Sequence, residues 1–353
     1  MAELRWHPLI QDWVMINSNR QNRPQMPKDW CPFCPGSGKV PDDYEVLKYD
    51  NDFPALSQNP PQPDDVANDF FKVRPSYGKC EVILYSPGHT TTLAQLSDQH
   101  MRKLVDLWAE RYADIRSDEN IKYVFIFENR GSMVGTSMPH PHGQIYGYSV
   151  IPKKLQLELA SAQQYRAQKG SCLFCDMLAA EKDFGKRIVF ENDSFTIFLP
   201  FFTEYPYGIY LFPKRHFSHI TDMTDAERTD FGVALKQIVG MFDTLFDKEF
   251  PYMMCMHNAP VNSGAVEEDF HFHVEFFPPL RSANQQKFNA SSETGAWAHC
   301  NPRCPEETAA ELRDEADKAL ETFQQRRQEA LKGPDKNGVS QSAIDAMLAQ
   351  LGM

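Results

Sequence analysis

The chain carries the same ordered series of potential metal ligands twice, and this repeat constrains the fold more than any other feature. Each copy begins with a Cys-x-x-Cys pair, contains a histidine eight residues before a Ser or Thr, and ends with a His-x-His pair. The two copies are Cys31, Cys34, His89, His140 and His142, and then Cys172, Cys175, His216, His271 and His273. Gene duplication explains two series with one order. We therefore expect two similar halves fused around one sheet system.

Hydrophobic patterning predicts the elements of these halves. Short apolar or alternating runs, typical of strands, occur at 81–85, 123–127, 195–199, 208–212 and 272–276. Amphipathic patterns at 98–117 and 225–247 predict one long helix per half, the second opened by a capping box at Thr224–Glu227. This arrangement indicates an α+β fold with a mostly antiparallel sheet and flanking helices.

Other segments complete the expected organisation. Residues 128–132 have the composition of a turn. In the tail we expect a helix that begins near Pro305, a break at Gly333-Pro334 and a second short helix at 340–351. The predicted division is an N-terminal half at 1–160, a C-terminal half at 161–300 and a helical tail at 301–353.

The overall charge excludes a nucleic-acid-binding surface. A formal net charge of −12 does not suit a phosphate backbone, which requires clustered Lys and Arg. No apolar stretch approaches the roughly 20 residues of a membrane span, and the first residues lack the apolar region of a signal peptide. We expect a soluble, cytoplasmic protein with no membrane partner. Eight cysteines in such a protein indicate metal thiolates more than disulfides.

The donor types of the repeat suit tetrahedral zinc, because two thiolates and two imidazoles form closed structural sites. The first predicted site contains Cys31, Cys34, His89 and His140, and it would tie the N-terminal loop to the strand that carries His142. The alternative is that each Cys-x-x-Cys is only a pair of buried small residues. Cys80 and Cys255 are expected in the core. Cys300 and Cys304 lie near His299 but have poor spacing for zinc, so we expect a surface or core role.

The pentapeptide His140-Pro141-His142-Gly143-Gln144 contains a candidate nucleophile. Residues two apart on an extended segment share a face, and Pro141 stiffens the backbone between the two imidazoles. A neutral imidazole attacks phosphorus well when an acceptor holds its second nitrogen, because this fixes the tautomer. In isolation, a His-x-His is more often a metal pair or a chance repeat. The neighbouring motifs favour His142 as a nucleophile.

Three motifs in sequence carry a resemblance to a known family. They are Phe127-Glu128-Asn129-Arg130-Gly131, Gly135-Thr136-Ser137-Met138-Pro139 and the His-Pro-His-Gly-Gln pentapeptide. In this order they resemble the galactose-1-phosphate uridylyltransferases, a branch of the histidine triad superfamily. The likeness covers most of the chain and ends near Asn301. It implies a duplicated histidine triad-like fold and a homodimer with active sites near the subunit boundary.

The resemblance also implies an activity. Members of this family are nucleotidyltransferases of galactose metabolism, in the Leloir pathway. They convert UDP-glucose and galactose 1-phosphate to glucose 1-phosphate and UDP-galactose by a ping-pong mechanism. On this view His142 carries the uridylyl group, while Gln144 and Ser137 contact the attacked phosphate.

The same resemblance assigns substrate contacts position by position. The matched residues are Arg20 and Arg23 for phosphate, Asn51 and Asp52 for uridine, Asn129 for the phosphates, and Lys287, Phe288 and Glu293 for the hexose and its phosphate. Residues 289–292 replace bulkier residues of the family, so the hexose preference stays open.

Two alternatives compete for the second metal. Cys172, Cys175, His216 and His271 resemble the second zinc site of related nucleotidyltransferases. The family's iron-type site uses a glutamate and three histidines, which match Glu158, His257 and His273 here, but the fourth position is Glu275. Soft sulfur ligands favour the thiolate set and zinc. We therefore predict two zinc ions and negligible iron, with Fe²⁺ at the second site as the alternative.

Two other functions are consistent with parts of the pattern. A nucleotide-sugar phosphorylase of the same superfamily, adenylyl or uridylyl, would use inorganic phosphate as its acceptor. A non-catalytic zinc-stabilised module would only bind nucleotides, but a binder has no need of a nucleophile beside an amide. Gly143 and the Lys287-Phe288 pair favour the uridylyltransferase.

Overall fold

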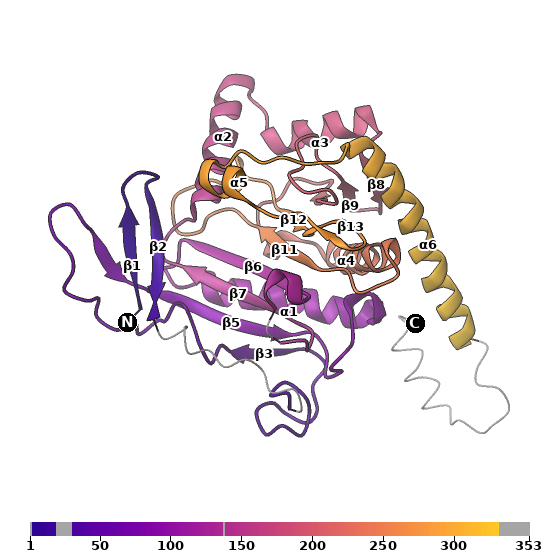
Figure 1. Ribbon diagram of the computed structural model, residues 1–353, viewed down its shortest axis with the longest axis horizontal. Coiled ribbons are helices and arrows are strands. Elements are labelled where there is room, and N and C mark those ends of the chain that lie inside the picture. The colour runs from indigo at the N-terminus through magenta and orange to yellow at the C-terminus, as the bar shows by residue number, and fades with distance from the viewer. Residues whose placement is uncertain (1, 19–29, 137, 332–353) are drawn as a thin grey trace.

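The computed structural model describes residues 2–18, 30–136 and 138–331, with side chains described as far as residue 325. A nine-stranded sheet forms its centre, and every pairing between neighbouring strands is antiparallel (Figure 1). In sheet order the strands are β3 (Leu47–Asp50), β5 (Gly78–Leu84), β7 (His142–Tyr148), β6 (Tyr123–Arg130), β11 (Tyr252–His257), β12 (His273–Phe277), β10 (Tyr210–Pro213), β9 (Phe195–Phe198) and β8 (Ile188–Glu191). The first half supplies the strands up to β6, and the second half continues from β11.

The two halves meet where β6 pairs with β11. Phe127 lies opposite Cys255, and Ile126 lies opposite Met256. On either side of this junction the order β5-β7-β6 is mirrored by β11-β12-β10. The sheet is therefore continuous across the two halves, as the repeated ligand series predicts.

Two long helices cover one face of the sheet. They are α1 (Asp98–Arg116) and α4 (Asp225–Leu245), and their apolar faces bury Trp108 and Phe242 in a core shared with strands of both halves. Each helix begins directly after the capping residue that the sequence predicts. Ser97 Oγ accepts from the backbone N–H of His100 at 3.0 Å, and Thr224 forms a reciprocal capping box with Glu227.

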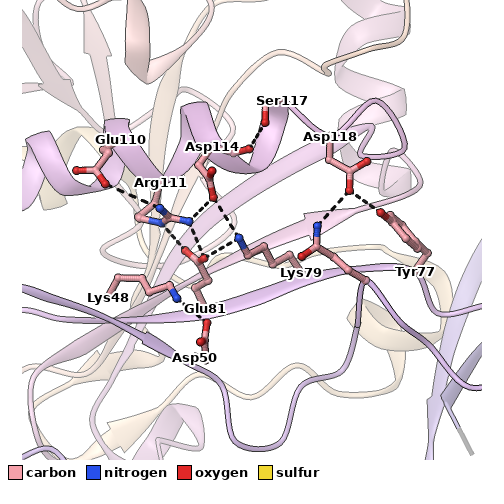
Figure 2. A network of polar contacts seen from close by, with 11 residues as sticks. Lys48, Asp50, Tyr77, Lys79, Glu81, Glu110, Arg111, Asp114, Ser117 and Asp118 are labelled. Atoms are coloured by element: carbon pink, nitrogen blue, oxygen red, sulfur yellow. Dashed lines mark hydrogen bonds and ion pairs between the residues drawn. The ribbon is translucent and has the colours of Figure 1, made fainter. Parts of the chain in front are cut away.

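A charged network fixes α1 to β5 (Figure 2). The carboxylate of Glu81 is fully buried on β5 and accepts two hydrogen bonds of 2.8 Å from Arg111 of α1. Lys79 joins the network through ion pairs with Glu81 at 3.2 Å and Asp114 at 3.1 Å. Because a buried carboxylate is costly without a cation, this pairing specifies how the helix sits on its strand.

Smaller elements surround the sheet. A three-stranded sheet of β1 (Ala2–His7), β2 (Asp12–Asn17) and β4 (Val73–Pro75) and a hairpin of β13 (Leu280–Ser282) and β14 (Gln285–Gln286) accompany it. The short helices are η2 (Leu93–Gln95), η3 (Ser132–Val134), η4 (Ile220–Asp222) and α5 (Ser291–Ala296). The tail helix α6 (Pro305–Leu331) begins as predicted and lies against α4 (Figure 1), where Thr244 Oγ1 donates to the carbonyl of Glu315 at 3.4 Å. The expected break at 333–334 and helix at 340–351 fall outside the described residues.

Two predictions of local structure are wrong. The expectation of one long helix per half missed α2 (Lys153–Lys169) and α3 (Leu173–Phe184). In α2 only Leu155 and Ala162 are buried, so its sequence has little amphipathic pattern to detect. The turn predicted at 128–132 begins too early, because β6 continues to Arg130. Glu128 and Arg130 are polar but buried, and sequence patterning cannot distinguish them from turn residues.

The α+β class with a mostly antiparallel sheet is confirmed. No helix within the described ranges has both the length and the apolar character needed to cross a bilayer.

Candidate active site and metal clusters

Four members of the first ligand series form one cluster beside the segment that leads into β7. Candidate ligand atoms of Cys31, Cys34, His89 and His140 all lie within 4.8 Å of one another. Cys34 Sγ is 3.4 Å from His89 Nδ1, and Cys31 Sγ is 3.7 Å from His140 Nδ1. Two soft thiolates with two imidazoles suit tetrahedral zinc, so these residues fit the predicted ion.

Backbone and side-chain contacts orient the His140 ring toward this cluster. Its Nε2 lies 2.8 Å from the carbonyl of Ser86 and 3.1 Å from the hydroxyl of Tyr44. Burial lowers the pKa of His140 to about 4, so the imidazole is neutral, which is the form that binds a metal. Sequence reasoning missed Tyr44, because its role depends on folding of the 30–45 loop over β5.

The second series forms an equivalent cluster at the start of α3. Candidate ligand atoms of Cys172, Cys175, His216 and His271 again lie within 4.8 Å of one another. Cys175 Sγ is 3.4 Å from His216 Nδ1 and 3.3 Å from His271 Nδ1. The donor set matches that of the first cluster and fits zinc for the same reason.

A third cluster lies between α2 and strands β11 and β12. It contains Glu158, His257, His273 and Glu275. His257 Nδ1 is 3.0 Å from the Glu158 carboxylate, and the Nε2 atoms of His257 and His273 are 3.5 and 3.6 Å from the Glu275 carboxylate. From the sequence, this set and the second thiolate set were expected as alternatives, but both clusters are present in the structure. His271 faces the sulfurs, whereas His273 faces His257 on the neighbouring strand.

The candidate nucleophile His142 is the first residue of β7, on the face of the sheet opposite α1 and α4. Its Nδ1 lies 2.8 Å from the carbonyl of His140. A carbonyl only accepts, so Nδ1 carries the proton and Nε2 carries the ring's lone pair. Only Pro141 separates His142 from His140, so the candidate nucleophile lies two residues from a ligand of the first metal cluster.

Gly143 is required by a close approach beneath β7. A Cβ at this position would lie 2.1 Å from the hydroxyl oxygen of Tyr85 and 3.1 Å from the carbonyl oxygen of Phe127. Tyr85 is buried, so its ring has little room to move aside. The glycine of the pentapeptide thus allows Tyr85 to support the strand between His142 and Gln144.

Gln144 lies on the same face as His142, and a neighbouring tyrosine orients its amide. The hydroxyl of Tyr146 donates to Gln144 Oε1 at 3.0 Å. Donation to the oxygen turns the amide N–H groups away from Tyr146. Residues 144 and 146 share a face because side chains alternate along a strand.

A cavity of about 450 Å³ extends along the segment from Met138 to His142. Its lining includes Asn129, Thr136 and Glu128. Glu128 is buried; its Oε1 accepts from Tyr252 at 3.1 Å, and Oε2 has no hydrogen-bond partner in the described structure. Burial, opposed by the nearby Arg130, raises the pKa of Glu128 to about 7.

Family profiles match nearly the whole described chain. The profile of the galactose-1-phosphate uridyl transferase N-terminal domain matches residues 2–152, and that of the C-terminal domain matches residues 158–322. The chain belongs to the galactose-1-phosphate uridylyltransferase family. The resemblance carried by the three sequence motifs is confirmed.

Individual galactose-1-phosphate uridylyltransferases match along most of their length. The protein of Thermotoga maritima is 39% identical over 315 residues, covering 89% of this chain and 98% of that protein. The Rattus norvegicus protein is 32% identical, covering 88% of this chain and 86% of its own. A solved uridylyltransferase structure is 31% identical with a TM-score of 0.83, covering 90% and 99% of the two chains. An ADP-glucose phosphorylase from Arabidopsis thaliana, 24% identical with a TM-score of 0.69 over 89% of this chain and 98% of that one, shares the fold.

The remaining residues matched to the uridylyltransferase family lie at several places. Asn51 and Asp52 follow β3, where Asn51 Oδ1 accepts from the backbone N–H of Phe53 at 2.9 Å and Asp52 accepts from Tyr49 at 3.0 Å. Asn129 lies near the end of β6. Arg20, Arg23 and Ser137 fall outside the described residues.

The residues matched to hexose binding belong to the second half of the uridylyltransferase fold. The Lys287 ammonium is buried 3.6 Å from the Glu293 carboxylate and 5.3 Å from the centre of the Tyr205 ring. The Phe288 side chain is 69% exposed. Cys300 and Cys304 are exposed and join none of the three clusters found in the described ranges.

Proposed function

We propose that this chain is a UDP-glucose–hexose-1-phosphate uridylyltransferase that works through a uridylyl-histidine intermediate at His142. The observation that carries the proposal is the 2.8 Å contact of His142 Nδ1 with the His140 carbonyl. This contact fixes the tautomer whose Nε2 can attack phosphorus, and it supports the positive charge that develops on the ring.

The reaction then proceeds in two balanced steps. Nε2 of His142 forms a bond to the α-phosphorus of UDP-glucose, and the bond to the bridging oxygen breaks, so glucose 1-phosphate leaves with the electron pair. In the second step a phosphate oxygen of galactose 1-phosphate attacks the same phosphorus. The N–P bond breaks toward the imidazole, which regains its neutral form, and UDP-galactose is released.

Donors in fixed positions stabilise the charge on the attacked phosphate. We assign this role to the Gln144 amide, which Tyr146 orients, and to Ser137. Arg20 and Arg23 are proposed phosphate ligands, and Asn129 is proposed to position the phosphates.

The remaining assignments concern the two ends of the substrate. Asn51 and Asp52 are proposed to bind uridine, and a carboxylate suits the paired hydroxyls of ribose. Lys287, Phe288 and Glu293 are proposed to bind the hexose and its phosphate. The buried pairing of Lys287 with Glu293 supports this, because a sugar phosphate needs a cation and an acceptor at one rim.

We propose Zn²⁺ in both thiolate clusters. When bound, zinc supplies a structural cross-link and no chemistry of its own. Cys31, Cys34 and His89 would anchor His140, and through it the start of β7. Cys172, Cys175, His216 and His271 would anchor the equivalent segment of the second half.

A cytoplasmic homodimer completes the proposal. Phe201, Phe288 and Trp297 are 72%, 69% and 56% exposed, and a subunit interface would remove these aromatic rings from water.

Isotope exchange tests the proposed function. A covalent intermediate lets the enzyme exchange labelled glucose 1-phosphate into UDP-glucose when galactose 1-phosphate is absent. We expect His142→Gly to abolish this exchange and Glu321→Ala, a control at an exposed position of α6, to retain it. Galactose 1-phosphate should then yield UDP-galactose. Exchange by His142→Gly at the wild-type rate, or turnover that requires inorganic phosphate, would contradict the assignment.

A further inference from the structure

The third cluster already contains a cation from the chain itself. Lys154 lies near the start of α2, one turn before Glu158, and its ammonium forms an ion pair with the buried carboxylate of Glu275. It also lies 3.9 Å from the Glu158 carboxylate. Lys154 thus contacts both acidic members of the cluster.

The strand register explains why these groups meet. His257 on β11 lies opposite His273 on β12, and Glu275 lies opposite Tyr210 on β10. His273 and Glu275 are two apart, so they share the face of the sheet that α2 covers. The side chains of α2 and of this sheet face therefore form one polar site.

The Glu275 carboxylate requires a positive partner because it is buried. Only 2% of its side chain is exposed, and a buried carboxylate without a cation is strongly disfavoured. Lys154 reaches it from the protein surface, with a half-exposed side chain whose ammonium also lies 4.8 Å from the centre of the Phe277 ring. The aromatic face adds a second attraction that holds the ammonium in place.

We propose that Lys154, rather than a metal ion, is the cation of the third cluster. A divalent ion bound there would share the Glu275 carboxylate with Lys154, whose ammonium contacts one of its two oxygens, and the charge of the ion would repel the ammonium at short range. Replacement of one imidazole of the family's iron-type set by Glu275 adds a negative charge, and Lys154 neutralises it. The cluster then joins α2 to β11 and β12 as an ionic contact.

This inference rests on the proposal that zinc occupies the two thiolate clusters, so the test compares metal content between variants and does not measure activity. Full-length protein is dialysed against excess Zn²⁺ or, without oxygen, against Fe²⁺, and bound metal per chain is measured by mass spectrometry. We expect about two equivalents in the wild type, as the two closed thiolate sites require. Lys154→Met keeps the apolar stem but removes the charge, and we expect it to bind one equivalent more than the wild type.

Two matched variants control for indirect effects. Lys154→Arg retains a cation and should match the wild type. Lys153→Met removes a neighbouring charge that has no ion pair in the described structure, and it should also match the wild type. A third equivalent in the wild type overturns the proposal, and so does a Lys154→Met protein that takes up no additional metal. Loss of zinc from wild type and variants alike would instead count against the thiolate sites.

Discussion

The hydrogen bond from Tyr146 to Gln144 has a kinetic consequence at the scale of single residues. Tyr146→Phe keeps the ring that packs against Phe127 at a centroid distance of 5.1 Å but removes the donor. We expect uridylyl exchange to slow about fivefold, because one neutral hydrogen bond contributes about 1 kcal/mol. The substrate KM should change little, since the amide acts on the phosphate charge of the transition state.

A double-mutant cycle tests whether Tyr146 acts through Gln144. Gln144→Ala alone should cost on the order of 10²-fold in rate. In that background Tyr146→Phe should have no further effect, because the group that it orients is absent. Equal slowing by Tyr146→Phe in both backgrounds would show that the tyrosine has a merely structural role.

Glu128 gives a pH dependence of stability. Burial raises the pKa of Glu128 from 4.5 to about 7. Between these two pH values the carboxyl group is protonated in the folded protein but ionised in the unfolded chain. Folding is therefore weakened as pH rises from about 4.5 through 7. Glu128→Gln cannot titrate, so between pH 6 and 8 the variant should gain about 1 kcal/mol relative to the wild type. Urea unfolding at pH 6 and pH 8 measures the free energy of unfolding of both proteins. The same difference between variant and wild type at the two pH values would contradict the prediction.

At the scale of elements, strand β7 depends on the absence of a side chain at Gly143. Gly143→Ala would place a Cβ 2.1 Å from the Tyr85 hydroxyl oxygen, which must shift the strand that carries His142. We expect a loss of about 1–3 kcal/mol in stability and a slower exchange reaction. Adding Tyr85→Phe removes the closest contact and should restore part of both. Unchanged exchange by Gly143→Ala, or no recovery in the double variant, would contradict this account of β7.

The elements also show what the sequence could predict. The starts of α1 and α4 were predictable because Ser97 and Thr224 cap them through contacts three residues away. The thiolate clusters were predictable as residue sets because the ligand types repeat in order. Tyr44, Tyr85 and Lys154 were not, because each acts on a residue that only the register of the sheet or the packing of a distant segment brings near.

At the scale of the whole molecule, the two halves share one sheet and one core. Separating them at residue 152 would expose the long edge of β6 and the apolar residues that face α4. We expect a fragment of residues 1–152 to aggregate or remain unfolded alone, because exposed strand edges and apolar surface associate. Coexpression with residues 153–353 should restore soluble protein. A fragment that is monomeric and melts cooperatively by itself would show that the halves are independent domains.

The central claim is that His142 becomes covalently uridylylated. Enzyme mixed with UDP-glucose alone is quenched in denaturant at alkaline pH, digested and examined by mass spectrometry. The account predicts one uridylyl group on the peptide that contains His142, and its loss when galactose 1-phosphate is added before the quench. An active enzyme that never carries this group, or that carries it on another residue, would contradict the account.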